Sequence, residues 1–184
     1  MTKPPERIVR ATRNGRTVKV PKPVLIVDSR EKTDFKWRFG RFAKWFAGVE
    51  VASLKAGDYS IGGYEDQIVV ERKSATDAVQ CTAPSQARAR FISNCERLSS
   101  ICRAAVVVET GFARLHRPVC PTAMHPNAVI GTLLALQSRF NVPIIFAGSR
   151  PLAEEWAAHF LTKSFVHLWL RENGHGDHFV DGDV

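Results

Sequence analysis

The 184-residue sequence has no long hydrophobic run, since no apolar stretch approaches the ~18 residues that a membrane-spanning helix needs. Its first residues, Met-Thr-Lys-Pro-Pro, contain no apolar segment typical of a secretory signal. No G-x-x-x-x-G-K-[ST] phosphate-binding loop occurs either. We therefore expect a protein that is not secreted, that lies in the cytoplasm or on the nucleoid (in the nucleus if eukaryotic), and that uses no membrane and no nucleotide cofactor.

Cysteine is scarce, with four residues and no C-x-x-C pair, which argues against a zinc ribbon or a redox motif. Without an export signal, free thiols in a reducing compartment are expected. The rest of the composition, with 45% hydrophobic and 24% charged residues, is ordinary for a globular protein of one domain.

Acidic residues are fewer than basic ones, 18 against 26, and the formal net charge is +8. A basic protein of this kind most often binds a polyanion. The charge is uneven, because residues 1–23 hold seven Lys or Arg and one acid, whereas residues 172–184 hold four acids and no Lys or Arg. We expect a basic N-terminal arm over 1–23, a domain over 24–171 and an acidic, flexible tail over 172–184.

The basic arm contains Asn14-Gly15, the strongest short hairpin signal, between two segments typical of strands. A two-residue loop there places Ala11 opposite Val18 and Arg10 opposite Lys19, so that like charges face one another. A phosphate could relieve that repulsion. The alternative is a flexible arm that becomes ordered only on binding.

Apolar runs alternate with amphipathic stretches, which predicts an α/β fold with a mixed sheet flanked by helices. Strands are expected over 24–28, 49–54, 59–61, 67–73, 104–108 and 143–147. Helices are expected from about 76, and over 85–102, 127–140 and 151–170. A basic amphipathic helix is expected over 35–46, whose aromatic face either packs on the sheet, binds a membrane surface or stacks on bases.

Acidic residues stand at the ends of three predicted strands: Asp28, Asp58 and Glu71. Since residues i and i+2 of a strand share a face, Glu71 and Lys73 project together while Arg72 points the other way. A carboxylate beside an ammonium suits metal-assisted phosphodiester cleavage. Carboxylates bind Mg²⁺ or Mn²⁺, the cation polarises the phosphate and acidifies water, and the lysine positions that water or stabilises developing charge.

Each of these residues also has a structural interpretation. Residues 71–73 can form a solvated charge run at a strand edge, and Arg30 and Glu31 can form a surface ion pair. Ser74 and Asp77 match a helix capping box. These interpretations leave unexplained why the acids follow apolar strands.

Three segments, Val27-Asp-Ser-Arg-Glu31, Gly57-Asp58 and Glu71-Arg-Lys-x-x-x-Asp77, resemble the signature of the xeroderma pigmentosum group F (XPF) family of structure-specific DNA endonucleases. The resemblance covers roughly residues 24–170 and implies a single restriction-endonuclease-like domain that uses Mg²⁺ or Mn²⁺. It implies that Asp28, Asp58 and Glu71 bind the metal and that Lys73 is the catalytic lysine, with the site completed by Arg30, Glu31, Arg72 and Asp77. Every acid and base of the motif is present, as in an active subunit.

The resemblance implies metal-dependent hydrolysis of DNA phosphodiesters in branched, flap or junction structures, during repair, recombination or replication. The alternatives are a nuclease of the same core acting on linear duplex or Holliday junctions, and a catalytically silent DNA-binding scaffold. Family nuclease domains tend to pair through late helices, so residues 127–140 and 151–170 could form a homodimer, whereas the alternative for both is core packing.

Family members usually carry a C-terminal tandem helix-hairpin-helix domain that binds DNA, and the 13 residues after Arg171 are too few for one. We expect the basic arm and the 35–46 helix to supply part of the missing grip on the DNA backbone. The residues expected to bind DNA are Arg10, Arg13, Arg16, Lys19, Lys36, Arg38, Arg41 and Lys44.

Overall fold

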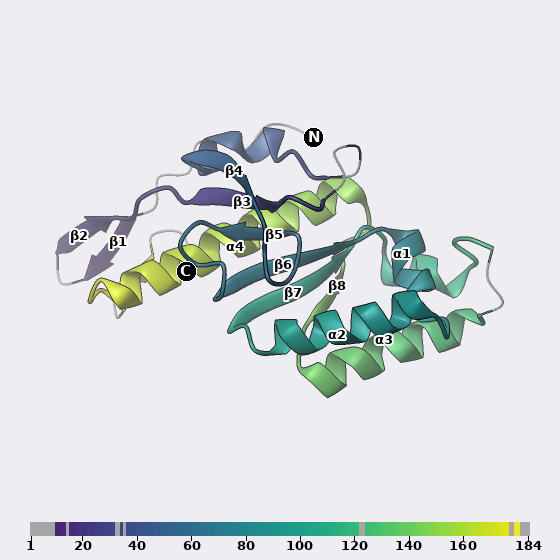
Figure 1. Ribbon diagram of the computed structural model, residues 1–184. Coiled ribbons are helices and arrows are strands. Elements are labelled where there is room, and N and C mark those ends of the chain that lie inside the picture. Colours follow the sequence, from purple (N-terminus) through teal and green to yellow (C-terminus); the bar gives the residue numbers. More distant parts are fainter. Residues whose placement is uncertain are drawn as a thin grey trace.

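The computed structural model describes residues 10–13, 15–31, 34, 36–121, 124–176 and 179–180. A six-stranded sheet forms the centre of the molecule, in the order β4-β3-β5-β6-β7-β8 (Figure 1). Its strands are β3 (Val24–Asp28), β4 (Gly48–Ala52), β5 (Tyr59–Ile61), β6 (Ile68–Lys73), β7 (Arg103–Val108) and β8 (Ile144–Phe146). Strand β5 runs antiparallel to both neighbours and the other pairs are parallel. The predicted mixed sheet is confirmed.

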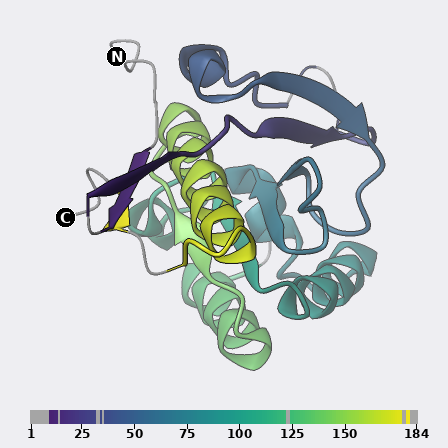
Figure 2. The ribbon, with the colours of Figure 1, turned by 90° about the vertical axis from the view of Figure 1, so that its left-hand side faces the viewer.

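Helices cover both faces of this sheet (Figures 1 and 2). On one face lie α4 (Arg150–Glu172) and the 3-10 helix η1 (Gly40–Trp45); on the other lie α1 (Ala75–Gln80), α2 (Gln86–Ser99) and α3 (Pro126–Phe140), with the 3-10 helix η2 (Phe112–His116) before α3. Each face has its own apolar cluster. Two covered faces explain why central strands such as β7 are almost continuously apolar.

The helix predicted over 35–46 is shorter than expected: of its described residues, only Gly40–Trp45 is helical, as a 3-10 segment. Phe39, just before it, has a left-handed backbone with φ of 50°. Its N–H donates to Glu154 of α4, and the N–H of Trp37 donates to the Tyr59 hydroxyl at 2.6 Å. Tertiary hydrogen bonds therefore take donors that a helix would need, and Phe35 lies outside the described residues.

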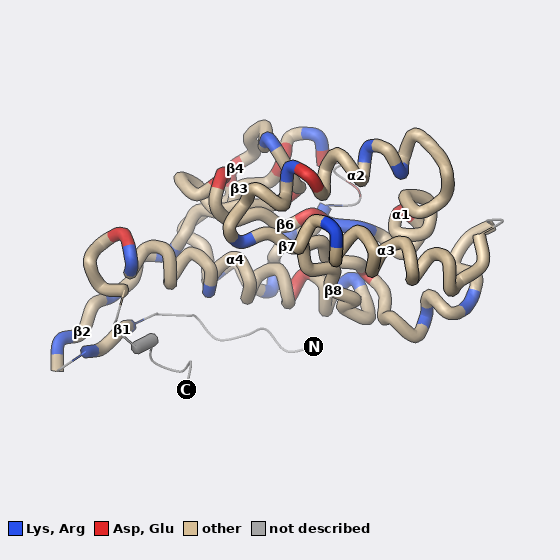
Figure 3. Tube along the Cα trace, turned by 90° about the horizontal axis from the view of Figure 1, so that it is seen from below, with Lys and Arg blue, Asp and Glu red and all other residues tan. Residues whose placement is uncertain are grey.

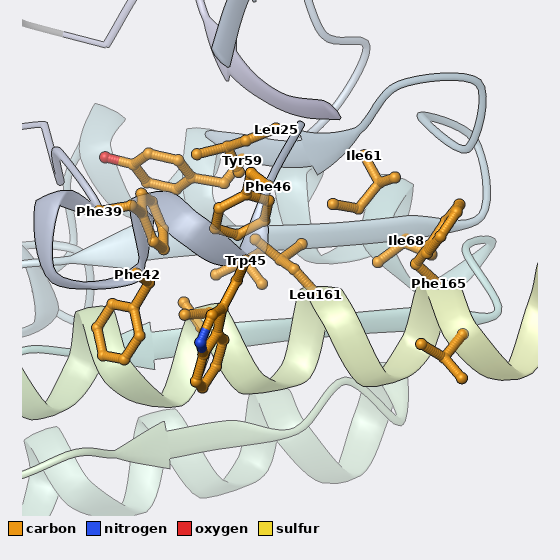
Figure 4. Close-up of a cluster of buried hydrophobic side chains, with 14 of the residues drawn as sticks. Leu25, Phe39, Phe42, Trp45, Phe46, Tyr59, Ile61, Ile68, Leu161 and Phe165 are labelled. Atoms are coloured by element: carbon orange, nitrogen blue, oxygen red, sulfur yellow. The ribbon is translucent and has the colours of Figure 1, made fainter. Parts of the chain in front are cut away.

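The aromatic side chains of this segment pack between the sheet and α4, which was one of the predicted alternatives (Figure 4). Phe39, Phe42 and Trp45 are buried, and they recur at the three-residue spacing of a 3-10 helix. The aromatic residues thus belong to the core, where they are unavailable for stacking on bases.

The basic arm forms the predicted hairpin, in which β1 (Arg10–Arg13) pairs with β2 (Arg16–Lys19). Arg10 lies opposite Lys19 and Ala11 opposite Val18, as expected. Ala11 is buried in the cluster beneath α4, so the hairpin packs on the domain.

Part of the segment expected to be a flexible tail, over 172–184, forms regular structure, and residues 177, 178 and 181–184 lie outside the described residues. Helix α4 continues to Glu172, and a short strand, β9 (Phe179–Val180), pairs antiparallel with β1. An otherwise unpaired edge of β1 exposes backbone N–H and C=O groups, which β9 satisfies. The two ends of the described chain therefore meet in one small three-stranded sheet.

All four cysteines are free thiols, as predicted. Within the described ranges, no helix combines the length and apolar character needed to cross a bilayer. Helix α4 buries one face against the sheet and η1, which is the predicted core-packing role, whereas α3 leaves Leu134 41% exposed. Pairing of two copies through these helices stays a prediction.

Candidate active site

Strand register brings three acidic residues into one row at one edge of the sheet. Strand β5 runs antiparallel to both β3 and β6. The end of β3 and the end of β6 therefore lie on either side of the residue that precedes β5. The three acidic residues are Asp28, Asp58 and Glu71. Backbone hydrogen bonds continue across the row, from Asp28 N–H to the Asp58 carbonyl at 2.8 Å and from Asp58 N–H to the Val70 carbonyl at 2.9 Å.

Gly57 allows Asp58 to lie this close to β6. Its φ is +71°, and a Cβ at this position would lie 2.1 Å from Cγ1 of Val69 and 3.0 Å from the carbonyl oxygen of Val70. Only glycine tolerates both the left-handed backbone and the close approach. The Gly-Asp pair therefore has a physical basis: the glycine permits the contact that positions the carboxylate.

The row of acids lines a cleft of about 360 Å³ on the face of the sheet that α1 and α2 cover. Glu71 and Lys73 project into it together from β6, as the alternation of strand residues predicts, and Lys73 Nζ donates to Glu71 Oε1. Of the residues predicted to form the active site, six line this cleft: Asp28, Arg30, Asp58, Glu71, Lys73 and Asp77.

Asp58 and Glu71 are carboxylates that repel one another across the cleft. Burial, and next the charge of Glu71, raise the pKa of Asp58 well above its usual range. Asp58 Oδ2 accepts the N–H of Arg72 at 2.7 Å, whereas Asp58 Oδ1 and Glu71 Oε2 accept no hydrogen bond from the described residues. Two such oxygens fit a hard divalent cation such as Mg²⁺ or Mn²⁺, which would relieve the repulsion.

Asp28 is placed differently, because both of its oxygens are fully engaged. Oδ1 accepts the backbone N–H and Nε of Arg30, both at 2.8 Å, and Oδ2 accepts Arg30 Nη2 at 2.9 Å and Leu54 N–H at 2.7 Å. Burial raises the pKa of Asp28, but the hydrogen bonds from Arg30 and Leu54 outweigh it, and the pKa is lowered. While Arg30 holds both oxygens, Asp28 offers a metal no free oxygen, and its role as a metal ligand stays a prediction.

Over the part of the chain that the structure describes, no three His, Cys, Asp or Glu side chains are grouped so as to hold a metal ion. Arg30 pairs with both carboxylate oxygens of Asp28. The Arg30 side chain is 67% exposed, so it can rotate away from Asp28 without leaving a buried space. The metal-binding prediction therefore rests on Asp58 and Glu71.

Lys73 is enclosed between a carboxylate and an aromatic ring. Its Nζ lies 5.2 Å from the centre of the Phe91 ring. Burial lowers the pKa of Lys73, but the charges of Glu71 and Asp58 raise it by a larger amount. The pKa of Lys73 therefore lies above its usual value. The side chain is therefore an ammonium group, a donor rather than a base.

The side chains of Arg72 and Glu31 lie behind the cleft, on the α4 face of the sheet, and neither residue lines the cleft. Arg72 Nε and Nη2 donate to the two oxygens of Glu109 at 2.8 and 3.0 Å, and Nη1 donates to Glu31 at 3.2 Å. The Trp37 indole donates to Glu109 as well, at 2.7 Å. Burial raises the pKa of Glu31, which the charge of Arg72 opposes. Both Arg72 and Glu31 hold β6 in place from behind.

Glu109 was not predicted to have a role, although the sequence carries a signal for it. Like Asp28, it is an acid directly after an apolar strand. Asp77, in turn, has the structural role that was weighed for it: it forms a capping box with Ser74, whose hydroxyl lies 2.6 Å from Asp77 Oδ2 and 3.1 Å from its N–H. It lines the cleft from that position.

Sequence reasoning also missed the cleft residues on α2: Arg90, Asn94 and Arg97. Their i, i+4, i+7 spacing defines one helix face and was a usable signal. It adjoins the apolar stripe of Phe91 and Cys95, which are buried. Lys55 lines the cleft from the loop before Gly57.

The cations predicted to bind DNA lie away from the cleft. Lys36, Arg38, Arg41 and Lys44 belong to the segment around η1, on the α4 face, and none lines the cleft. Arg41 instead pairs with Glu155 at 3.3 Å. Figure 1 shows the hairpin at the start of β3. The cleft lies at the other end of that strand, where Asp28 lines it. Figure 3 shows basic positions on the hairpin and mixed acidic and basic positions around β3, β6 and α2.

The ERCC4 domain matches residues 27–160 of this chain, a range that contains every acid and base of the cleft motif. The protein described as "Putative ATP-dependent RNA helicase MJ1505", from Methanocaldococcus jannaschii, is 34% identical over 142 residues, which is 76% of this chain and 15% of that protein. This chain thus spans a small part of that relative's length.

Two solved structures share the fold. XPF from Aeropyrum pernix is similar with a TM-score of 0.57 at 18% identity, over 83% of this chain and 70% of that one. XPF from Aeropyrum pernix in complex with DNA is similar with a TM-score of 0.56 at 18% identity, over 78% of this chain and 66% of that one. The predicted restriction-endonuclease-like arrangement of a mixed sheet between helices agrees with this likeness.

Proposed function

This chain belongs to the ERCC4 domain family, and from that membership and its cleft we propose that it is a DNA endonuclease that hydrolyses phosphodiester bonds with Mg²⁺ or Mn²⁺. The observation that carries the proposal is the juxtaposition of Asp58, Glu71 and Lys73 in one cleft at the ends of neighbouring strands. A DNA complex of the similar Aeropyrum pernix XPF supports DNA as the substrate.

Asp58 and Glu71 would hold the cation through oxygens that no described residue uses. When bound, the cation would polarise the scissile phosphate and lower the pKa of a water beside it. Lys73 points its ammonium into the same cleft, where it can donate to a phosphate oxygen and stabilise the charge that develops there. Arg72 and Glu109 keep β6 in register from behind, so that Glu71 and Lys73 stay side by side.

The substrate that we propose is branched, flap or junction DNA, as the resemblance to XPF nucleases implies, and the corresponding processes are repair, recombination or replication. Linear duplex and four-way junctions are the competing substrates. A catalytically silent scaffold is opposed by the complete set of acids and lysine in the cleft.

The test is cleavage of labelled flap, fork, four-way and linear DNA in Mg²⁺, Mn²⁺ or EDTA, by the parent chain and by Glu71→Gln. We expect cleavage of the branched substrates in metal, none in EDTA, and a loss of about 10²–10³-fold in Glu71→Gln, because an electrostatic contact to the reacting group is removed. Glu96→Gln, an exposed change on α2, is the control. Cleavage that survives EDTA or Glu71→Gln would contradict the metal mechanism, and binding without cleavage would favour the scaffold.

A further inference from the structure

The cleft has a second wall whose residues the proposed reaction does not use. Helix α2 presents Arg90, Asn94 and Arg97 to the cleft, and Lys55 reaches it from the loop before Gly57. Three of these four side chains are cations, whereas the facing strand ends carry the acids. A polyanion with one phosphate at the acids therefore has further donors within the same cleft.

Asn94 is buried, with 9% of its surface exposed, and Arg97 sets its orientation. Arg97 Nη2 donates to Asn94 Oδ1 at 3.2 Å, and Arg97 Nη1 donates to the Ser93 hydroxyl at 3.1 Å. A guanidinium group only donates, so the atom of Asn94 that faces it must be the amide oxygen. The amide nitrogen is left as a donor that no described residue accepts, in a side chain that lines the cleft.

Two cations of this wall are held differently, since Lys55 can change partners easily whereas Arg97 is oriented by residues of its own helix. Lys55 Nζ lies 3.0 Å from both oxygens of Asp66, but the two side chains are 84% and 70% exposed, and such pairs are worth about 0–1 kcal/mol. Arg97 uses its hydrogen bonds along its own helix, to Ser93 and Asn94, which fixes the plane of its guanidinium without neutralising its charge. A fixed guanidinium plane suits recognition of a phosphate.

We propose that Lys55, Asn94 and Arg97 together bind a phosphate next to the scissile one, on the DNA strand that is cut. The proposal deepens the proposed function and rests on it, since the scissile phosphate is placed at Asp58 and Glu71. A cleft of about 360 Å³ has the size of a pocket for one small ligand.

The experiment is a binding cycle in EDTA that combines protein variants with a modified DNA strand. A labelled fork carries a neutral methylphosphonate at one phosphate at a time around the site at which the parent chain cuts in Mn²⁺. The variants are Arg97→Gln, Lys55→Gln and Asn94→Asp, the last of which keeps an oxygen for Arg97 but replaces the amide donor. Arg88→Gln, on the same helix but outside the cleft, is the matched control for charge.

We expect each of the three variants to bind the unmodified fork about tenfold more weakly, since a charge-assisted hydrogen bond is removed. For Arg97→Gln and Lys55→Gln, the slope of log K against log salt should fall by about 0.7, the value for one single-strand phosphate contact. A methylphosphonate at one position should lower the affinity of the parent chain and of Arg88→Gln about tenfold. The same methylphosphonate should not lower the affinity of Arg97→Gln any further.

The proposal would be overturned if every methylphosphonate lowered the affinity of Arg97→Gln by the same factor as that of the parent chain. It would also be overturned if Arg97→Gln and Arg88→Gln lost affinity equally, because the loss would then reflect net charge alone. Both outcomes leave the proposed function intact, because cleavage in Mn²⁺ reports it separately. A parent chain that does not cleave would overturn the proposed function and this proposal with it.

Discussion

At the scale of single residues, folding and metal binding favour different protonation states of Asp58. Its carboxyl is held against β6 by the close approach at Gly57, and Glu71 lies beside it. Burial and that neighbouring charge raise its pKa, so the fold favours the protonated form whereas metal binding requires the ionised one. A partly buried carboxylate that weakens the fold but serves the site is typical of functional residues.

Asp58→Asn should therefore stabilise the metal-free protein at neutral pH. The pKa of Asp58 is higher in the folded state than its unfolded value of about 3.9. The contribution of Asp58 to stability is therefore fully present below about pH 3.9 and is lost as the pH rises through the folded-state pKa. Removing the charge should raise Tm at pH 7–8 in EDTA and leave Tm unchanged near pH 3. A gain of about 1 kcal/mol corresponds to roughly 2–4 °C for a domain of this size.

Glu50→Gln, on the exposed edge strand β4, removes an acid that lies at the surface and is the control for this measurement. A Tm of Asp58→Asn that is lower than the parent's at pH 8 would contradict the assignment of Asp58 as a destabilising carboxylate.

At the scale of elements, β6 is held on its two faces by different chemistry. Its Glu71 and Lys73 face the cleft, while Arg72 is 6% exposed on the other face and binds Glu109 at the end of β7. Trp37, before η1, donates to the same carboxylate. One acid thus ties β6, β7 and the aromatic segment together.

Glu109→Gln should destabilise the protein by about 3 kcal/mol, the size typical of breaking a buried ion pair, because Arg72 would lose its bidentate partner. The measurement is urea unfolding, with the exposed Glu96→Gln as the control, which should change stability by less than about 0.5 kcal/mol. A Glu109→Gln variant as stable as the parent would mean that Glu31 alone compensates the charge of Arg72.

At the scale of the whole molecule, the hairpin precedes the start of β3 (Figure 1), whereas Asp28 at the end of β3 lines the cleft. Five residues at about 3.3 Å each separate the two ends of that strand by about 17 Å, the length of roughly five base pairs at 3.4 Å each. The hairpin places Arg10 opposite Lys19 and Arg13 opposite Arg16, and like charges directly opposite one another are destabilising, so a bound anion would relieve the repulsion. We propose that the hairpin holds duplex DNA beyond the cut site.

The double variant Arg13→Gln/Arg16→Gln should weaken duplex binding and lower the salt slope by about 0.9 for each phosphate that the hairpin no longer binds. The cleavage rate at saturating DNA should not change, because the hairpin is remote from the cleft. Arg117→Gln/Arg139→Gln, which removes the same charge elsewhere, is the control. Deleting the arm would be a poorer test, since Ala11 and Val20 are part of the core. An unchanged salt slope would remove the hairpin from DNA binding.

Local patterns were enough to place much of this protein. The register that joins Asp58 and Glu71 follows from strand alternation and from the short connection between β5 and β6. Asp28 joins them only because β3 pairs with β5 across the segment that holds η1 and β4. The capping box of Ser74 and Asp77 and the hairpin at Asn14-Gly15 depend on neighbours within a few residues of the chain, and both predictions are confirmed.

What the sequence pattern could not show depends on how distant segments pack. The left-handed backbone conformation of Phe39 accompanies a hydrogen bond to Glu154, which lies more than a hundred residues away in the sequence. The helical spacing of the aromatic residues does not predict that hydrogen bond. The α2 residues face the cleft because of how that helix docks on the sheet. Local residue order thus specified the strands, their facing and the acids at their ends, because these depend on short-range sterics. Which cations reach the cleft, and that β3 brings Asp28 beside Asp58, follow from long-range packing.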